Sequence, residues 1–62
     1  MLLFASSSQA ASDIVGALGS AGFEVSFQRR SGAFPVSVAV AEDSEAAVLD
    51  IAKAADPAVQ AR

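Results

Sequence analysis

Apolar positions recur along the chain in two rhythms, which predict an alternation of strands and helices. Residues 2–5 form a short, wholly apolar run that is typical of a buried first strand. The next apolar positions repeat at intervals of three and four residues and predict a helix over about residues 7–21. These positions are Ala11, Ile14, Val15 and Leu18. Ser6 and Gln9 match a capping box at the start of this helix, and Gly22 fits the left-handed position after its end.

Two further segments alternate apolar and polar residues with a period of two, which is typical of strands buried on one side. The apolar sets are Phe23, Val25 and Phe27, and then Phe34, Val36, Val38 and Val40. Residues 29–33 between them are mostly polar and contain a glycine, as expected of a hairpin loop. Pro35 is tolerated because the hydrogen-bond ladder of the third strand only begins there.

An acidic segment at residues 42–45 predicts the start of a second helix, with Asp43 or Ser44 as its N-cap. The apolar positions that follow at helical spacing are Val48, Ile51, Ala52 and Ala55. Pro57 ends this helix, because the residue before a proline is biased away from helical angles. Residues 58–62 then form a short tail.

These elements predict one α+β domain over residues 1–62 with the order β-α-β-β-α. This order matches the first five elements of the ferredoxin-like plan and lacks its last strand, so the plan is truncated. Right-handed crossovers place the third strand between the other two, which gives a three-stranded sheet of order 1-3-2 with both helices on one face. The other face carries small, mildly polar side chains, namely Ser26, Gln28, Ser37 and Ala39.

Strand one is an apolar edge strand in this arrangement, and proteins usually cover such an edge. Three alternatives remain open. The tail folds back over the strand, or a second copy pairs with it to form a homodimer, or a strand of another protein is added there.

Composition excludes many kinds of chemistry. The chain has 62 residues and contains neither cysteine nor histidine. Zinc fingers, thiol redox centres, haem sites and Ser-His-Asp triads are therefore excluded. Residues 42–45 lack the spacing and the glycine of a calcium loop, so we expect no metal and no cofactor. A domain this small has little volume for a catalytic cleft, and we do not expect an enzyme.

No targeting or membrane segment is predicted. The apolar start covers five residues, whereas a signal peptide needs about 7–15 apolar residues behind a basic start and a membrane helix needs about 20. The absence of cysteine fits a reducing compartment. We therefore expect a mature, soluble, cytoplasmic protein.

The formal net charge is −3, and the fold separates the charges between its two ends. The acids expected at one end are Glu24, Glu42, Asp43 and Glu45, and the bases expected toward the other are Arg29, Arg30, Lys53 and Arg62. Acids at a helix start stabilise the helix dipole and keep a protein in solution, which is the simplest explanation. Three acids within four residues, with a fourth nearby, exceed what capping needs and favour a site for a basic protein surface.

Two other polar segments have simple explanations. Residues 6–8 resemble an anion-binding turn, but they lack the glycines and the lysine of a phosphate loop, and helix capping is the better interpretation. Arg29 and Arg30 are two bases on an acidic chain without Tyr or Trp, which favours a solvated loop over a nucleic-acid site.

In its general character the chain is short, acidic, built as one domain and without catalytic or cofactor motifs, and it resembles the small acidic phage-encoded anti-CRISPR inhibitors. The resemblance implies a partner among the CRISPR effector subunits of the bacterial host cell that hold DNA or recognise its flanking motif. Glu42, Asp43 and Glu45, with Glu24 in support, would imitate nucleic-acid phosphates and pair with Lys or Arg of that partner, without direct contact to nucleic acid. The alternative is a self-associating ferredoxin-like regulatory or assembly module that forms a homodimer through strand one.

Overall fold

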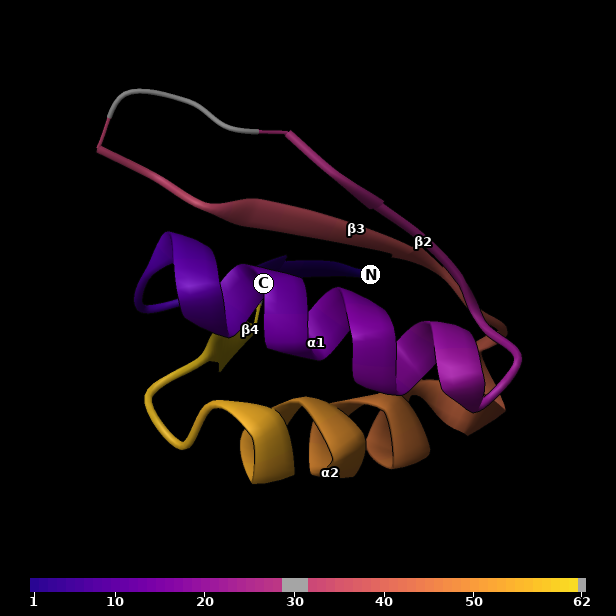
Figure 1. The fold of residues 1–62 in the computed structure, drawn as a ribbon. Coiled ribbons are helices and arrows are strands. Elements are labelled where there is room, and N and C mark those ends of the chain that lie inside the picture. Colours follow the sequence, from indigo (N-terminus) through magenta and orange to yellow (C-terminus); the bar gives the residue numbers. More distant parts are fainter. Residues whose placement is uncertain (29–31, 62) are drawn as a thin grey trace.

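Two helices lie on the same side of a four-stranded antiparallel sheet in the computed structural model of the chain, which describes residues 1–28 and 32–61 (Figure 1). The strands are β1 (Leu2–Phe4), β2 (Glu24–Phe27), β3 (Pro35–Ala39) and β4 (Gln60–Ala61). The helices are α1 (Ser8–Ser20) and α2 (Glu45–Ala55), and a 3₁₀ turn, η1 (Glu42–Ser44), leads into α2. The predicted α+β class is confirmed, with one strand more than the three expected.

The strands lie side by side in the order β2-β3-β1-β4. Leu3 of β1 lies opposite Val36 of β3, and Val25 of β2 lies opposite Val38 of β3. The predicted neighbour order 1-3-2 is thus confirmed for the first three strands. The backbone nitrogen of Met1 donates to the Val38 oxygen at 2.9 Å, and the Val38 N–H donates to the Met1 oxygen at 2.8 Å. These two bonds extend the ladder between β1 and β3 by one residue.

The predictions of a three-stranded sheet and of an exposed first strand are wrong, because the C-terminal segment forms β4 beside β1. Leu3 lies opposite Ala61, and Phe4 lies opposite Gln60. After the end of α2, Val59 enters the core with 7% of its surface exposed and thereby directs the chain back to the sheet. The tail therefore covers β1, which was one of the three alternatives. A homodimer through strand one has no unpaired β1 edge to use.

Helix α1 begins with a different cap from the predicted one. The Ser7 hydroxyl accepts a hydrogen bond from the Ala10 N–H at 3.1 Å, so Ser7 is the N-cap. The capping box predicted for Ser6 and Gln9 is wrong, because both side chains donate to aspartates instead. Gly22, with φ at +93°, takes the left-handed conformation predicted for the residue after the helix.

The core lies between the helices and the inner face of the sheet. Its buried apolar residues are Leu3, Ala5, Ala11, Ile14, Leu18, Val36, Val38, Val48, Ala52 and Val59. The helical spacing predicted five of these, and it is confirmed on both helices. The aromatic residues Phe23, Phe27 and Phe34 are only partly buried and pack against the border of this core. The folded state therefore depends on a small aliphatic cluster to which α1, α2, β1 and β3 contribute buried residues, together with Ala5 and Val59 of the connecting segments.

Helix α1 carries a glycine that its surroundings do not require. A Cβ atom built at Gly16 meets no other atom within 4 Å. We expect Gly16→Ala to raise the free energy of unfolding by about 0.5–1 kcal/mol, because alanine restricts the unfolded chain and favours the helix. Gly22→Ala is the control and should lower it by about 1–2 kcal/mol, since alanine is strained at a positive φ. Urea unfolding followed by circular dichroism measures both changes in the free energy of unfolding. Equal effects at the two positions would contradict the distinction between a helical Gly16 and a left-handed Gly22.

Candidate functional site

The acidic segment predicted from the sequence lies where the chain leaves the sheet and enters α2. Glu42 and Asp43 belong to η1, Glu45 is the first residue of α2, and all three are exposed. Ser44 occupies the N-cap position of α2, as predicted, but its side chain makes no capping hydrogen bond. The chain is already helical at this residue, with φ −102° and ψ −1°, because η1 runs directly into α2. The three carboxylates are thus held on continuous helical backbone.

Glu24 belongs to the same end of the molecule. It is the first residue of β2 and lies opposite Ala39, the last residue of β3, just before the chain turns into η1. The first turn of α2 and the start of β2 lie at one end of the fold (Figure 1). The four predicted site residues, Glu24, Glu42, Asp43 and Glu45, therefore occupy this end together, and we name them the acidic corner.

The side chains of the acidic corner are exposed and have no partner among the described residues. No hydrogen bond or ion pair within residues 1–28 and 32–61 engages any of the four carboxylates. Of the bases predicted for the opposite end, Lys53 is exposed in the last turn of α2, away from Glu45 at its start. Arg29, Arg30 and Arg62 lie outside the described residues. The four carboxylates of the corner are therefore hydrated in the free protein and accessible to a binding partner.

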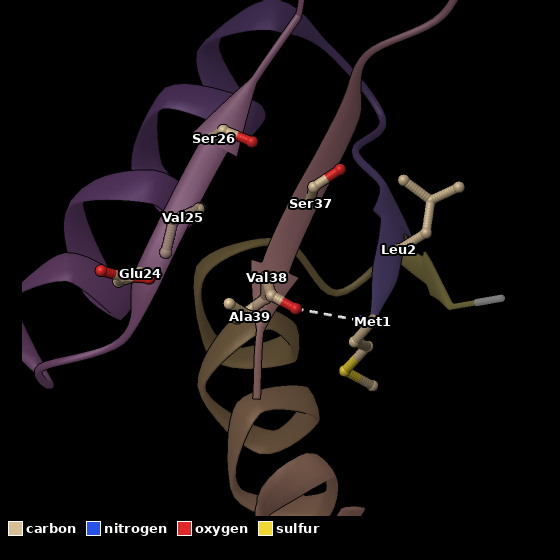
Figure 2. Close-up of a pocket in the computed structure, with 8 residues that line it drawn as sticks. All are labelled: Met1, Leu2, Glu24, Val25, Ser26, Ser37, Val38 and Ala39. Carbon is tan, nitrogen blue, oxygen red and sulfur yellow. Dashed lines mark hydrogen bonds between the residues drawn. The ribbon is translucent and has the colours of Figure 1, made fainter. Parts of the chain in front are cut away.

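Two hollows lined by described residues lie on the sheet face turned away from the helices. One hollow, of about 550 Å³, is lined by Met1, Leu2, Glu24, Val25, Ser26, Ser37, Val38 and Ala39 (Figure 2). The other, of about 390 Å³, is lined by Leu2, Phe4, Gln28, Ala33, Pro35 and Ser37. Leu2 and Ser37 belong to both, so the hollows are neighbours and form one shallow depression across β2, β3 and β1. We name this depression the sheet groove.

The lining of the sheet groove was predicted only in part. Ser26, Gln28, Ser37 and Ala39 are exposed on this face, as the period of two predicted. Leu2 and Phe4 were missed, because residues 2–5 were predicted to be wholly buried. Within β1 only Leu3 is buried, whereas Leu2 and Phe4 are half-buried and line the groove. A three-residue strand with apolar side chains on both faces gives no alternation from which this could be predicted.

Asp56 is the one buried charged residue in the described part of the chain, with 4% of its surface exposed. Its carboxylate accepts hydrogen bonds from the Ser6 N–H at 2.8 Å, the Ser6 hydroxyl at 2.9 Å and the Ala58 N–H at 3.1 Å. Burial by itself raises the pKa of the Asp56 carboxyl, but these hydrogen bonds outweigh it and hold the pKa below its ordinary value. The anion at the serine-rich turn is therefore the protein's own carboxylate.

Neither the described residues nor a comparison with known proteins gives a further functional assignment. Among the described residues no group of three acidic side chains converges closely enough to hold a metal ion. No helix in the described ranges has the length and apolar character needed to cross a membrane. The chain matches no protein-family model, no curated protein and no solved structure. The acidic corner and the sheet groove are therefore the candidate sites among the described residues.

Proposed function

We propose that this protein is a small non-enzymatic inhibitor that seats its acidic corner in a basic nucleic-acid-binding site of a bacterial effector complex. The observation that carries the proposal is the gathering of four exposed carboxylates at one end of the fold without a described partner. The partner class is the one implied by the resemblance to anti-CRISPR inhibitors. The acids would pair with Lys or Arg side chains that otherwise hold phosphates, and the protein would not touch nucleic acid itself.

The fold supplies the rigidity that such mimicry needs. Glu42, Asp43 and Glu45 stand on helical backbone, and Glu24 stands on a strand that is paired along its length with β3. Because the backbone is already ordered, binding has to fix only the side-chain rotamers of the carboxylates, so more of the electrostatic attraction is retained as affinity. We propose that the domain follows the ferredoxin-like plan, with β4 as the last strand, and serves as a support for the corner.

The size of the charge suggests how much of the partner is blocked. The net charge is −3, which is small beside the charge of even one turn of duplex DNA. An imitation of a long duplex would need a longer acidic surface. A plug in a short basic pocket, such as one that recognises a few nucleotides, needs only the corner. The expected mode is therefore local competition with a short stretch of nucleic acid.

Charge reversal at the corner tests the proposal. We expect Glu42→Lys combined with Glu45→Lys to weaken partner binding at least 100-fold, because both attractions become repulsions. The matched control is Asp13→Lys combined with Asp50→Lys, at exposed positions away from the corner. Each reversal adds two positive charges, so both double variants change the net charge from −3 to +1. The measurement is capture of effector complexes from a bacterial lysate on each immobilised variant, followed by elution with short duplex DNA.

The outcomes separate a site from a general charge effect. A nucleic-acid-handling complex that wild type and the control retain, that DNA elutes and that the corner variant loses supports the proposal. Equal loss in both double variants would mean that total charge alone drives binding. Retention by the folded corner variant would exclude the corner as the site. Unfolding curves check the fold, because exposed substitutions usually change stability by less than about 0.5 kcal/mol each.

A further inference from the structure

We propose that the sheet groove is the second half of the docking surface and that it binds an α-helical segment of the partner. This segment carries an apolar side chain and, two to three helical turns away, a basic side chain. The inference rests on the proposed function, since it takes the partner to be a protein with a basic surface. It extends the interface from the acidic corner to the face for which the sequence predicted small, mildly polar side chains.

The groove has the width of a helix. It spans β2, β3 and β1, which are consecutive in the sheet. Two strand-to-strand spacings amount to about 10 Å, and a helix with its side chains measures about 10–12 Å across. Ser26, Ser37 and Leu2 form one row across the three strands, since Ser37 lies opposite both of the others. The serine side chains are short, so a helix can approach the middle of the sheet closely.

The two ends of the groove differ in chemistry. At one end Phe4, Ala33 and Pro35 give the smaller hollow an apolar floor beside Gln28, and Leu2 continues this floor into the middle row. At the other end Glu24 lines the larger hollow, and it is the acidic residue that the groove shares with the acidic corner. Figure 2 shows Glu24 at this end of β2, with Ser26, Ser37 and Leu2 farther along the face. The complement of such a groove is apolar at one end and positively charged at the other.

The distance between the two ends sets the spacing of the ligand. Pro35 marks the apolar end of β3 and Ala39, opposite Glu24, marks its acidic end, four residues farther along. Four residues of strand span about 13 Å. A helix rises 1.5 Å per residue, so side chains at positions i and i+7 or i+11 of one helix face lie about 10–17 Å apart. An apolar residue at i and arginines at i+7 and i+11 therefore fit both ends.

A peptide titration tests this complement directly. The probe is an 18-residue alanine-based helical peptide with leucine at position 4 and arginine at positions 11 and 15. The matched control peptide has glutamate in place of both arginines. We titrate each into the ¹⁵N-labelled full chain and expect the arginine peptide to bind at least 10-fold more tightly. The chemical-shift changes that this peptide causes in the labelled chain should centre on Leu2, Ser26 and Ser37. Equal affinities, no binding, or shifts centred on α1 and α2 would overturn the inference.

Groove variants supply the second readout. Ser37→Trp fills the middle of the groove from an exposed position, and Ser26→Trp does so from the neighbouring strand if the first variant misfolds. We expect either variant to weaken binding of the arginine peptide at least 10-fold, whereas Asp50→Asn, an exposed residue of α2 outside the groove lining and the acidic corner, should change this affinity less than 2-fold. Light scattering at the titration concentration identifies the competing occupant. A dimer of the wild-type chain that Ser37→Trp dissociates would assign the groove to a second copy and overturn the inference.

The same variants on the captured partner separate this inference from the proposed function. If the corner variant and Ser37→Trp each lose the partner, the result supports the proposed function and the groove as a docking surface. Loss in the corner variant alone leaves the proposed function standing and overturns the groove as a docking surface. Loss in Ser37→Trp alone supports the groove and overturns the corner as the site. Retention in both folded variants overturns both.

Discussion

Replacing Asp56 with alanine is expected to lower the free energy of unfolding by about 2–4 kcal/mol. The carboxylate accepts two hydrogen bonds from Ser6 and one from Ala58, and it is almost completely buried. Hydrogen bonds to charged groups contribute about 1.5–3 kcal/mol each. The three bonds share one carboxylate, and water can reach the exposed donor residues Ser6 and Ala58 after the substitution, so the expected loss is smaller than their sum.

A loss of this size removes most of the stability of such a short domain. A chain of this length without disulfides or metals rarely has more than about 3–5 kcal/mol. Asp56→Ala should therefore populate the unfolded state visibly at 25 °C, which urea titration and amide exchange both report. Asp50→Ala is the control, because Asp50 is an exposed aspartate of α2, the helix that Asp56 directly follows. Equal stability of the two variants would contradict the assigned role of Asp56.

The same carboxylate gives the fold a defined pH dependence. Its pKa in the folded protein lies below the ordinary value of 3.8, so the folded state binds the proton less readily than the unfolded chain. The stabilisation is complete above the unfolded-state pKa and is lost as the pH falls through the folded-state pKa. We expect the stability difference between wild type and Asp56→Asn to be constant from pH 7 to about pH 5 and to shrink below about pH 4. A difference that grows toward low pH would reverse the assigned direction.

Asp56 also shows which parts of the fold a single sequence can predict. Helical spacing located Ile14, Leu18 and Val48, because a helix repeats its buried face several times within one segment. Asp56 was interpreted only as the residue before Pro57. Its partner Ser6 lies 50 residues away in the chain, and no local pattern links the two. Long-range polar contacts of this kind require the fold to be known first.

The fourth strand was missed for a related reason. β4 has two residues, Gln60–Ala61, and a strand this short shows neither alternation nor an apolar run. The burial of Val59 and the open edge of β1 bring it into the sheet, and both are tertiary effects. The sequence nevertheless predicted that this edge needs a cover, because an unpaired apolar strand attracts another strand. The need for a cover was predicted and the tail was one of three alternatives for it, but no local pattern showed that the tail pairs with β1 as a strand.

The candidate site likewise has one part that the sequence predicts, the acidic corner, and one part that it does not, the sheet groove. Three acids of the corner are neighbours in the sequence, and the hairpin between β2 and β3 predicted that Glu24 joins their end of the sheet. The sheet groove was not predictable, because it depends on which side of β1 each side chain takes. Leu2, Leu3 and Phe4 are all apolar, so the composition of the strand is the same for either orientation. The register of β1 against β3 decides the matter.

Separate truncations of Leu2 and Leu3 are expected to distinguish the contributions of β1 to stability and to binding. Leu3 is completely buried between β3 and β4 on the inner face, and Leu3→Ala should cost about 2–5 kcal/mol and leave the domain largely unfolded. Leu2 is half-buried on the opposite face and is not among the residues that pack against the core, so Leu2→Ala should cost about 1–2 kcal/mol, less than Leu3→Ala. Thermal and urea unfolding of the two variants measure this difference.

Leu2, whose truncation costs less stability than that of Leu3, should matter directly for binding of the arginine peptide. Leu2 lines both hollows of the sheet groove, so Leu2→Ala should remain folded and yet bind the apolar-anchored arginine peptide more weakly, whereas its acidic corner is unchanged. A partner attracted only by charge would bind Leu2→Ala as tightly as wild type, and its affinity would fall only with added salt. If Leu2→Ala instead unfolds as readily as Leu3→Ala, the two side chains share the core and the groove has no apolar floor. Successive side chains of a strand point to opposite faces. In β1, Leu3 therefore contributes to stability, and Leu2, one residue away, contributes to recognition.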